Sequence, residues 1–285
     1  MNIIATSTGV DIANKIQVDL DRFPDGELHV RIMGDLRGED VAIIGNTYPN
    51  DGIIELLLLI DAVGEMKPNS INVVIPYLGY GRQDRIFEAG EALSIRAICG
   101  CLCDVDRVVL IDPHSWLVRD FFRSQVEELT AIPLLARWME GKVDFIVAPD
   151  KGSARRAEIA ARELGVEYIV MQKKRNSAYD VEVAIESGQE KLDGQRVGIV
   201  DDIISTGGTM AKACSALRAE GAKEIYLACT HGLFLRDSLK TLSTLTDGIA
   251  TTDSLGENRR RGKEGKVKLI SLGPLITSIF DPPKR

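Results

Sequence analysis

The sequence predicts an α/β protein of two similar domains, each a parallel sheet flanked by helices. Short apolar runs without strict alternation recur along the 285 residues, which is typical of strands buried on both faces of a parallel sheet. Stretches with helical spacing lie between these runs, and strand–helix alternation indicates βαβ units. A third observation is an internal repeat, because residues 41–52 and 197–208 both read as a strand, a glycine-ending loop and a helix start.

The individual elements follow from the same patterns. Apolar residues within 210–217 recur on one helical face, and those within 159–164 indicate a second helix. Two polar stretches are predicted to be irregular: residues 173–180, and residues 257–266, which read as a solvated loop with three arginines. The predicted strands are residues 41–44, 71–75, 108–111, 145–148, 168–170, 197–200 and 225–228.

The repeat also predicts where the chain divides. We expect the boundary near residues 129–133, which gives a first domain at residues 1–130 and a second at residues 131–285. The extreme C-terminus is a candidate to pack back on the first domain.

The charge balance limits the partners of the protein. The 42 Asp and Glu residues outnumber the 35 Lys and Arg residues, which gives a net charge of −7. This balance weighs against a protein that wraps nucleic acid, because phosphate neutralisation needs a surplus of cations. It still allows a phosphorylated small substrate, which needs only a local basic pocket. With 45% hydrophobic residues, the chain can bury a core without disulfides or a structural metal.

The five cysteines indicate a reducing, cytoplasmic compartment. Their number is odd, and Cys99, Cys101 and Cys103 have a spacing that matches neither a disulfide framework nor a CxxC zinc site. We assign these three no functional role. The chain opens without a basic, apolar leader, and its longest aliphatic run, residues 56–60, is too short to span a bilayer. We therefore expect neither a signal peptide nor binding to a membrane.

The strongest chemical signal is the segment VDDIISTGGT at residues 200–209. A predicted strand ends in two carboxylates, and a loop of hydroxyl and glycine residues then opens a helix. Glycines let backbone N–H groups converge on an anion, and the helix N-terminus adds partial positive charge. The segment predicts a sugar-phosphate site, with a capped strand–helix turn as the structural alternative. The candidate residues are Asp201 and Asp202 for the sugar hydroxyls, directly or through a metal, and Ser205, Thr206, Gly207, Gly208 and Thr209 for the phosphate.

This segment resembles the phosphoribosyl-diphosphate signature of type I phosphoribosyltransferase folds, which implies that fold for both domains. Two classes of enzyme share the signature: the phosphoribosyltransferases and the ribose-phosphate pyrophosphokinases. Further elements between residues 23 and 280 resemble the second family, and its archaeal-type members most. That resemblance implies ATP and ribose 5-phosphate as substrates and Mg²⁺ as the metal.

Two elements resemble the ATP site of that family. Residues 22–27 (RFPDGE) resemble the segment that contacts adenine from a neighbouring subunit, which implies at least a homodimer. Read alone, Asp-Gly is a hairpin-turn signal. Residues 76–85 resemble the family's PYxxYxRQDR, where a planar guanidinium suits a nucleotide phosphate. The implied ATP-binding residues are Phe23, Asp25, Gly26, Glu27, Arg82, Gln83 and Asp84.

Two further elements resemble the metal and pyrophosphate sites of the family. Residues 112–115 match its D-x-H element, which implies that His114 helps to hold Mg²⁺ and the ATP phosphates. A lone histidine is more often structural, so this assignment depends on the pattern around it. Residues 148–152 (APDKG) resemble its SPDxG loop, which implies that Asp150 serves the metal and that Lys151 and the backbone accept pyrophosphate.

The last element is the basic run KKR at residues 173–175. It stands where the family has a catalytic K-x-R, which implies that Lys173 and Arg175 act on the transferring group and that Arg175 also contacts ribose 5-phosphate. The structural alternative is a solvated basic loop. The order and spacing of all the elements favour the catalytic interpretation.

Together these elements predict transfer of the β,γ-diphosphoryl group of ATP to the anomeric hydroxyl of ribose 5-phosphate, giving phosphoribosyl diphosphate and AMP. A phosphoribosyltransferase is a rival that leaves the ATP elements unexplained. A non-enzymatic regulatory homologue is a second rival, and it is expected to lack catalytic groups that this chain retains. A nucleic-acid-binding regulator on the same fold is disfavoured by the negative charge.

Overall fold

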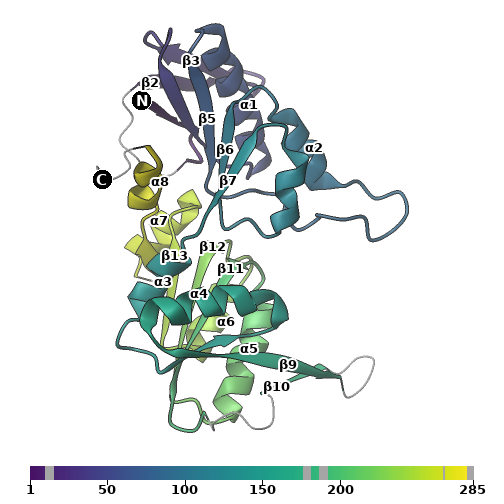
Figure 1. The fold of residues 1–285 in the computed structure, drawn as a ribbon, viewed down its shortest axis with the longest axis vertical. Helices are drawn as coiled ribbons and strands as arrows, with labels where there is room; N and C mark the ends of the chain where they lie inside the picture. Colours follow the sequence, from purple (N-terminus) through teal and green to yellow (C-terminus); the bar gives the residue numbers. More distant parts are fainter. Residues whose placement is uncertain (10–15, 176–180, 186–191, 266, 281–285) are drawn as a thin grey trace. The chain divides into compact units, whose positions relative to one another are not determined.

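The computed structural model describes residues 1–9, 16–175, 181–185, 192–265 and 267–280, with the backbone alone for residues 172–175 and 181–185. The chain divides into two compact units (Figure 1). The first consists of Met1–Thr130, Ser254–Gly256 and Leu272–Arg285, and the second of Ala131–Asp253 and Glu257–Ser271. None of the helices within these described ranges has both the length and the hydropathy needed to cross a bilayer.

The first unit is built on a five-stranded parallel sheet in the order β1-β4-β5-β6-β7. A separate antiparallel hairpin pairs β2 (Gln17–Arg22) with β3 (Leu28–Met33). The sheet strands are β1 (Asn2–Ala5), β4 (Asp40–Ile44), β5 (Ser70–Ile75), β6 (Arg107–Ile111) and β7 (Gln125–Leu129). The helices are α1 (Asn50–Glu65), α2 (Ser94–Cys101), the 3₁₀ helix η1 (Trp116–Phe121) and α8 (Gly273–Phe280).

The second unit is built on a seven-stranded sheet in the order β10-β9-β8-β11-β12-β13-β14, parallel except for the β9–β10 hairpin. Its strands are β8 (Phe145–Ala148), β9 (Glu167–Arg175), β10 (Val181–Ile185), β11 (Arg196–Ile204), β12 (Glu224–Gly232), β13 (Gly248–Thr252) and β14 (Lys268–Ile270). Its helices are α3 (Ile132–Met139), η2 (Lys151–Ser153), α4 (Ala154–Leu164), α5 (Gly208–Ala219), α6 (Ser238–Leu245) and α7 (Gly256–Lys263).

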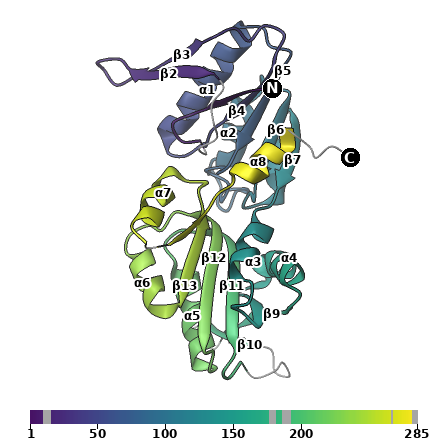
Figure 2. The ribbon, with the colours of Figure 1, turned by 90° about the vertical axis from the view of Figure 1, so that its left-hand side faces the viewer.

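Helices cover both faces of the second sheet, with α3 and α4 on one face and α5 and α6 on the other (Figure 2). Neighbouring residues of β11 face opposite cores: Ile199 packs with the α5 residues, whereas Val200 packs with α3 and α4. A strand buried on both sides reads as a continuous apolar run, and every strand predicted from such a run is present. The predicted α/β class, with a parallel sheet flanked by helices in each half, is confirmed.

The two sheets share one strand order. Reading β1-β4-β5-β6-β7 against β8-β11-β12-β13-β14 places β4 and β11 in equivalent positions, each followed by a loop and a helix. The internal repeat read from the sequence therefore corresponds to a repeat in topology. This equivalence also pairs the loop after β1 with the loop after β8.

Two expectations about irregular segments are wrong. Residues 256–263 form helix α7 instead of a solvated loop, because Arg260 pairs with Glu264 at 3.0 Å and Arg261 pairs with Glu257 at 3.0 Å, four residues apart. Residues 173–175 continue β9, because β10 pairs with them across the hairpin. The rest of the second stretch, residues 176–180, lies outside the described residues.

Candidate active site

The phosphate loop, residues 205–209, lies between β11 and α5. Gly207 adopts a left-handed conformation with φ 73° and precedes a helix whose first turn has neither a side-chain cap nor an acidic residue. The first N–H groups of α5 and the positive end of its dipole are therefore uncompensated by the helix itself. Thr206, Gly208 and Thr209 are exposed at this end. The loop can accept a phosphate on backbone N–H groups and hydroxyls.

The loop is held from behind by the segment that follows β12. Leu235 donates its backbone N–H to the Ser205 carbonyl at 2.9 Å, and the Ser238 hydroxyl donates to the same oxygen at 3.2 Å. Phe234 donates to the Ile204 carbonyl at 3.1 Å. These bonds fix the loop backbone before any ligand binds, which lowers the ordering cost of binding.

Gly207 is where this packing is tightest. A Cβ there would lie 3.0 Å from Ser238 Cβ and 3.2 Å from Leu242 Cδ1, at a φ of +73° that side chains rarely adopt. We predict that Gly207→Ala weakens binding of a sugar phosphate at least about tenfold, since the loop must shift. Calorimetric titration with ribose 5-phosphate checks this, and Gly64→Ala, which lies outside the loop and whose Cβ meets nothing within 4 Å, is the control. Equal affinity in both variants would contradict the prediction.

Asp201 and Asp202 lie in the last part of β11, and both are held by Arg156 of α4. The Arg156 Nη2 atom lies 2.8 Å from Asp201 Oδ1 and 3.2 Å from Asp202 Oδ1, and its Nε donates to Asp201 Oδ1 at 3.0 Å. The sequence analysis gave Arg156 no role. Parallel pairing of β8 with β11 is what brings α4, which follows β8, alongside the two carboxylates.

Burial raises the pKa of the Asp201 carboxyl to about 7, and the neighbouring Asp202 charge adds to this while Arg156 opposes it. The folded protein therefore favours protonated Asp201. This contribution to stability is present at low pH and is lost as the pH rises through about 7.

The pyrophosphate loop, residues 148–152, begins at the end of the neighbouring strand. Val147 of β8 pairs with Ile199 of β11, so the two strands end at the same edge of the sheet. The Asp150 carboxylate accepts the Ser153 N–H at 3.1 Å, which caps the short helix η2. Lys151 is exposed beside it. The structure thus brings Asp150 to the same sheet edge as the phosphate loop.

Lys173 and Arg175 lie near the end of β9. The pairing of β9 with β8 ends at Ala148 and Val170, and beyond that point β10 is the one partner of β9 among the described residues, through Val183 and Val181. The backbone at both positions is thus part of the two-stranded β9–β10 hairpin (Figure 1). Their side chains lie outside the described residues.

In the first unit, the predicted adenine contacts form the tip of the β2–β3 hairpin. Phe23 and Glu27 bond to each other through the backbone at 2.8 Å, and Gly26 takes φ 94° in the turn. Phe23 keeps half of its surface exposed and packs edge-on against His29. Arg22 pairs with Asp51 at 2.6 Å. The structure brings Phe23, Asp25, Gly26 and Glu27 together as one exposed tip.

The nucleotide element, residues 76–85, follows β5 and meets the D-x-H element that follows β6. A hydrogen bond from Ser115 lowers the pKa of the Asp84 carboxyl below its ordinary value. The element passes so close to the histidine that a Cβ at Gly81 would lie 3.8 Å from His114 Cβ. Gln83 accepts a hydrogen bond from Ser94 at 2.7 Å, while Arg82 is exposed. The predicted phosphate-binding groups of this unit therefore gather at one sheet edge.

Comparison with known proteins decides the family. The chain matches the model for the N-terminal domain of ribose phosphate pyrophosphokinase over residues 2–105 and the phosphoribosyl transferase domain model over residues 124–240. The chain belongs to the ribose-phosphate pyrophosphokinase family. Ribose-phosphate pyrophosphokinase from Thermococcus kodakarensis is 38% identical over 248 residues, which is 85% of this chain and 87% of that protein.

Further members of the ribose-phosphate pyrophosphokinase family agree with this assignment. The protein of the same name from Sulfolobus acidocaldarius is 35% identical over 93% of this chain and 92% of its own length. The crystal structure of phosphoribosylpyrophosphate synthetase from Mycobacterium smegmatis matches with a TM-score of 0.82 and 26% identity over 99% of both chains. Two phosphoribosyltransferase-like domains, as the sequence predicted, are thus confirmed.

Mg²⁺ fits the oxygen donors that the pyrophosphokinase site presents. The described residues contain no group of three or more His, Cys, Asp and Glu side chains that could hold a metal ion by themselves. Mg²⁺ is usually held by one or two carboxylates, several waters and substrate phosphates, so it does not need such a cage. Asp150, which lies at the sheet edge beside the phosphate loop, is a donor of this kind.

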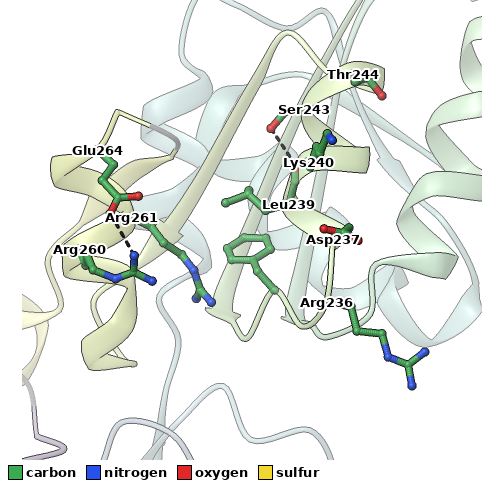
Figure 3. Close-up of a pocket in the computed structure, with 10 residues that line it drawn as sticks. Arg236, Asp237, Leu239, Lys240, Ser243, Thr244, Arg260, Arg261 and Glu264 are labelled. Carbon is green, nitrogen blue, oxygen red and sulfur yellow. Dashed lines mark hydrogen bonds and ion pairs between the residues drawn. The ribbon is translucent and has the colours of Figure 1, made fainter.

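A separate cavity of about 580 Å³ lies behind the phosphate loop, between α6 and α7 (Figure 3). Arg236 and Lys240 point away from Arg260 and Arg261, so the four cations do not converge on one point. The Arg261 guanidinium has a structural role, because it donates hydrogen bonds to the Gly232 and Leu233 carbonyls, both at 3.1 Å. The wall of this cavity, formed by residues 234–237 with α6, supports the phosphate loop. The lining residues are Phe234, Arg236, Asp237, Leu239, Lys240, Ser243, Thr244, Arg260, Arg261 and Glu264.

Proposed function

We propose that the chain catalyses the family reaction, in which ATP and ribose 5-phosphate give phosphoribosyl diphosphate and AMP. The observation that carries this proposal is the edge of the second sheet, where an open phosphate loop lies beside two carboxylates clamped by Arg156. An open anion site next to acceptors for hydroxyl groups suits a phosphorylated sugar. The ATP elements of the first unit then distinguish this function from that of a phosphoribosyltransferase.

The proposed reaction is an in-line displacement at the β-phosphorus of ATP. A bond forms between the anomeric oxygen of the sugar and the β-phosphorus. The bond from that phosphorus to the α,β-bridging oxygen breaks, and this oxygen leaves with AMP while the hydroxyl proton is released. Negative charge spreads over the phosphoryl oxygens, so positioning and electrostatic stabilisation carry most of the rate.

We assign the residues of the second unit to the sugar and the transferring group. The phosphate loop, Ser205 to Thr209, binds the 5-phosphate. Asp201 and Asp202 accept hydrogen bonds from the ribose hydroxyls. Lys173 and Arg175 bind the diphosphoryl group, and Arg175 also contacts ribose 5-phosphate.

We assign the first unit to ATP. Arg82, Gln83 and Asp84 bind the nucleotide, and His114 and Asp150 are the groups that would hold Mg²⁺ with the ATP phosphates. When bound, Mg²⁺ supplies neutralisation of the phosphate charges. We propose that the chain divides at residues 130 and 131, with the nucleotide contacts in the first domain and the sugar contacts, together with Asp150, in the second.

The hairpin tip supports a homo-oligomeric enzyme. Phe23 exposes half of its surface, and the described contacts of residues 23–27 lie within the hairpin. We propose that Phe23, Asp25, Gly26 and Glu27 bind adenine at the site of a neighbouring subunit, so the active form is at least a dimer. The cytoplasmic location, based on cysteines that are free thiols in the described residues, is part of the same proposal.

A chromatographic assay tests the function. Purified protein is incubated with Mg²⁺, ATP and ribose 5-phosphate, and AMP is followed over time. AMP that appears only with the sugar phosphate supports diphosphoryl transfer. Absence of AMP, with inorganic phosphate added and GTP and ADP also tried as donors, contradicts the proposal and favours the non-enzymatic homologue.

The protonation of Asp201 predicts a pH dependence for substrate binding. A pKa of about 7 means that the ionised fraction of this carboxylate rises about tenfold between pH 6 and pH 8. The carboxylate is a pure acceptor on both oxygens, whereas the protonated acid carries an O–H donor on one of them, so ribose 5-phosphate binding is expected to strengthen over this range. Calorimetric titration at several pH values checks this. The Asp201→Asn protein, which cannot titrate there, should show a flatter profile, and an equally steep one would contradict the assignment.

A further inference from the structure

The loop after β4 is equivalent in topology to the phosphate loop, yet the protein itself binds its side chains. β4 and β11 hold the same place in the strand order, and each leads through a loop into a helix. In the loop after β11, Thr206 and Thr209 are exposed. In the loop after β4, Asn46 and Thr47 are buried, with 1% and 0% of their surface exposed.

Both polar atoms of the Asn46 side chain have hydrogen-bond partners within the protein. Its Nδ2 donates to the carbonyls of Thr8 and Ser254, both at 2.7 Å, and its Oδ1 accepts the N–H of Tyr77 at 2.8 Å. Its own backbone N–H donates to the Thr8 hydroxyl at 3.1 Å. One amide side chain thus joins three chain segments: the loop after β1, the start of the nucleotide element and residues 254–256.

The same loop fixes the next residues of the nucleotide element. The Thr47 hydroxyl accepts the N–H of Gly79 at 2.8 Å, and Asn50 accepts the Tyr80 hydroxyl at 2.7 Å. The two backbones approach so closely that a Cβ at Gly79 would lie 2.7 Å from the Thr47 carbonyl oxygen. Tyr80, at φ 64°, then accepts the N–H of Gln83 at 3.2 Å, which sets the turn that presents Arg82.

A side chain of the protein also binds the loop after β1. It is equivalent in topology to the pyrophosphate loop after β8, and its Ser7 donates both its N–H and its hydroxyl to the Glu55 carboxylate at 2.5 Å. Glu55 lies on α1 and is 4% exposed. In the first unit, therefore, a carboxylate and an amide of the protein take the places that the proposed function gives to ligand groups in the second.

The hydrogen bond from Asn46 to the Ser254 carbonyl involves a short segment, residues 254–256, that lies between two stretches of the second unit in the sequence. Residues 254–256 belong to the first unit, whereas Asp253 before them and Glu257 after them belong to the second. The Ser254 carbonyl that accepts from Asn46 thus lies where the chain passes between the units. A buried bond at this point ties the nucleotide element to that passage.

We propose that Asn46 is a positioning residue for the nucleotide, which holds residues 77–80 in register so that Arg82 and Gln83 face ATP. The proposal rests on the proposed function. Asn46 acts through the backbone of Tyr77 and not through contact with a substrate. Thr47 and Asn50 complete the same support, so the loop after β4 serves as a scaffold for the ATP site.

The test compares nucleotide binding with sugar binding. Asn46→Asp keeps the shape but sets a carboxylate oxygen against the Thr8 and Ser254 carbonyls. We expect the KM for ATP to rise at least tenfold while the KM for ribose 5-phosphate stays within twofold. Asn72→Ala is the control, because Asn72 is a half-buried amide of the same sheet that bonds to Val41 and Ser70 at 3.3 Å. A uniform change in both KM values, or none in either, overturns the proposal.

A second pair of variants tests the proposal if the Asn46→Asp protein does not fold. Thr47→Ser keeps the hydroxyl that accepts the Gly79 N–H, and Thr47→Val removes it at nearly the same volume. ATP affinity should fall several-fold in Thr47→Val and stay near that of the unmodified protein in Thr47→Ser. Equal affinity in the two variants overturns the proposal.

Two readouts separate this proposal from the assigned reaction. Calorimetric titration with MgATP alone measures nucleotide binding without turnover, and hydrogen exchange at the Tyr77 and Gly79 amides reports the register directly. If the unmodified protein binds MgATP but makes no AMP, the proposed reaction is wrong and the positioning role is not affected. If Asn46→Asp leaves both MgATP binding and hydrogen exchange unchanged, the positioning role is wrong and the proposed reaction is not affected.

Discussion

Lys173→Ala is expected to reduce turnover about a thousandfold, the effect of one cation on the transferring group in comparable phosphoryl transfers. In the proposed reaction negative charge spreads over the diphosphoryl oxygens, and Lys173 is proposed to bind them without belonging to the ATP or phosphate sites. The KM for ATP should therefore change little. Steady-state kinetics with both substrates varied make the measurement.

The adjacent lysine provides the control for this experiment. Lys174→Ala removes the same charge one position along β9 but leaves the K-x-R pattern intact. A specific role for Lys173 requires a loss of turnover in Lys173→Ala that is far larger than in Lys174→Ala. Near-normal turnover in Lys173→Ala would contradict the assignment of Lys173 as a catalytic residue.

Arg156→Gln is expected to destabilise the fold by about 3 kcal/mol at pH 8, since it leaves two adjacent, mostly buried carboxylates without their cation. The arginine side chain keeps 22% of its surface exposed, which favours the lower end of the range for buried pairs. The same change should weaken ribose 5-phosphate binding, because Asp201 and Asp202 are no longer held in place.

The pH dependence of the Arg156→Gln effect separates this mechanism from a general packing loss. The pKa of Asp201 is raised to about 7, so below that pH a proton can relieve the missing cation. The destabilisation should therefore be smaller at pH 6 than at pH 8. Urea unfolding at both pH values measures it, with the exposed neighbour changed in Arg155→Gln as the control. A loss of equal size at the two pH values would rule out this explanation.

Local patterns in the sequence were enough for seven of the described strands and for the phosphate loop, whereas the sheet strands β1, β7, β13 and β14 were not predicted. Residues 197–200 predicted β11 because a strand covered on both faces needs apolar residues at every position. The phosphate loop could be found because its carboxylates, hydroxyls and glycines are contiguous, so no knowledge of the fold is needed to place them together. Helix α7 escaped prediction because it has almost no apolar face, and its stability depends on ion pairs between residues four apart.

The fold class, the family and the residues of each contiguous motif could thus be predicted from the amino-acid order. The residues that support those motifs could be found only in the folded chain. Arg156 clamps Asp201 from 45 residues away, and Asn46 bonds Ser254 from 208 residues away. Contacts of this kind leave no periodicity or spacing in the chain, because they form only when parallel strands bring the ends of distant loops to one edge of a sheet.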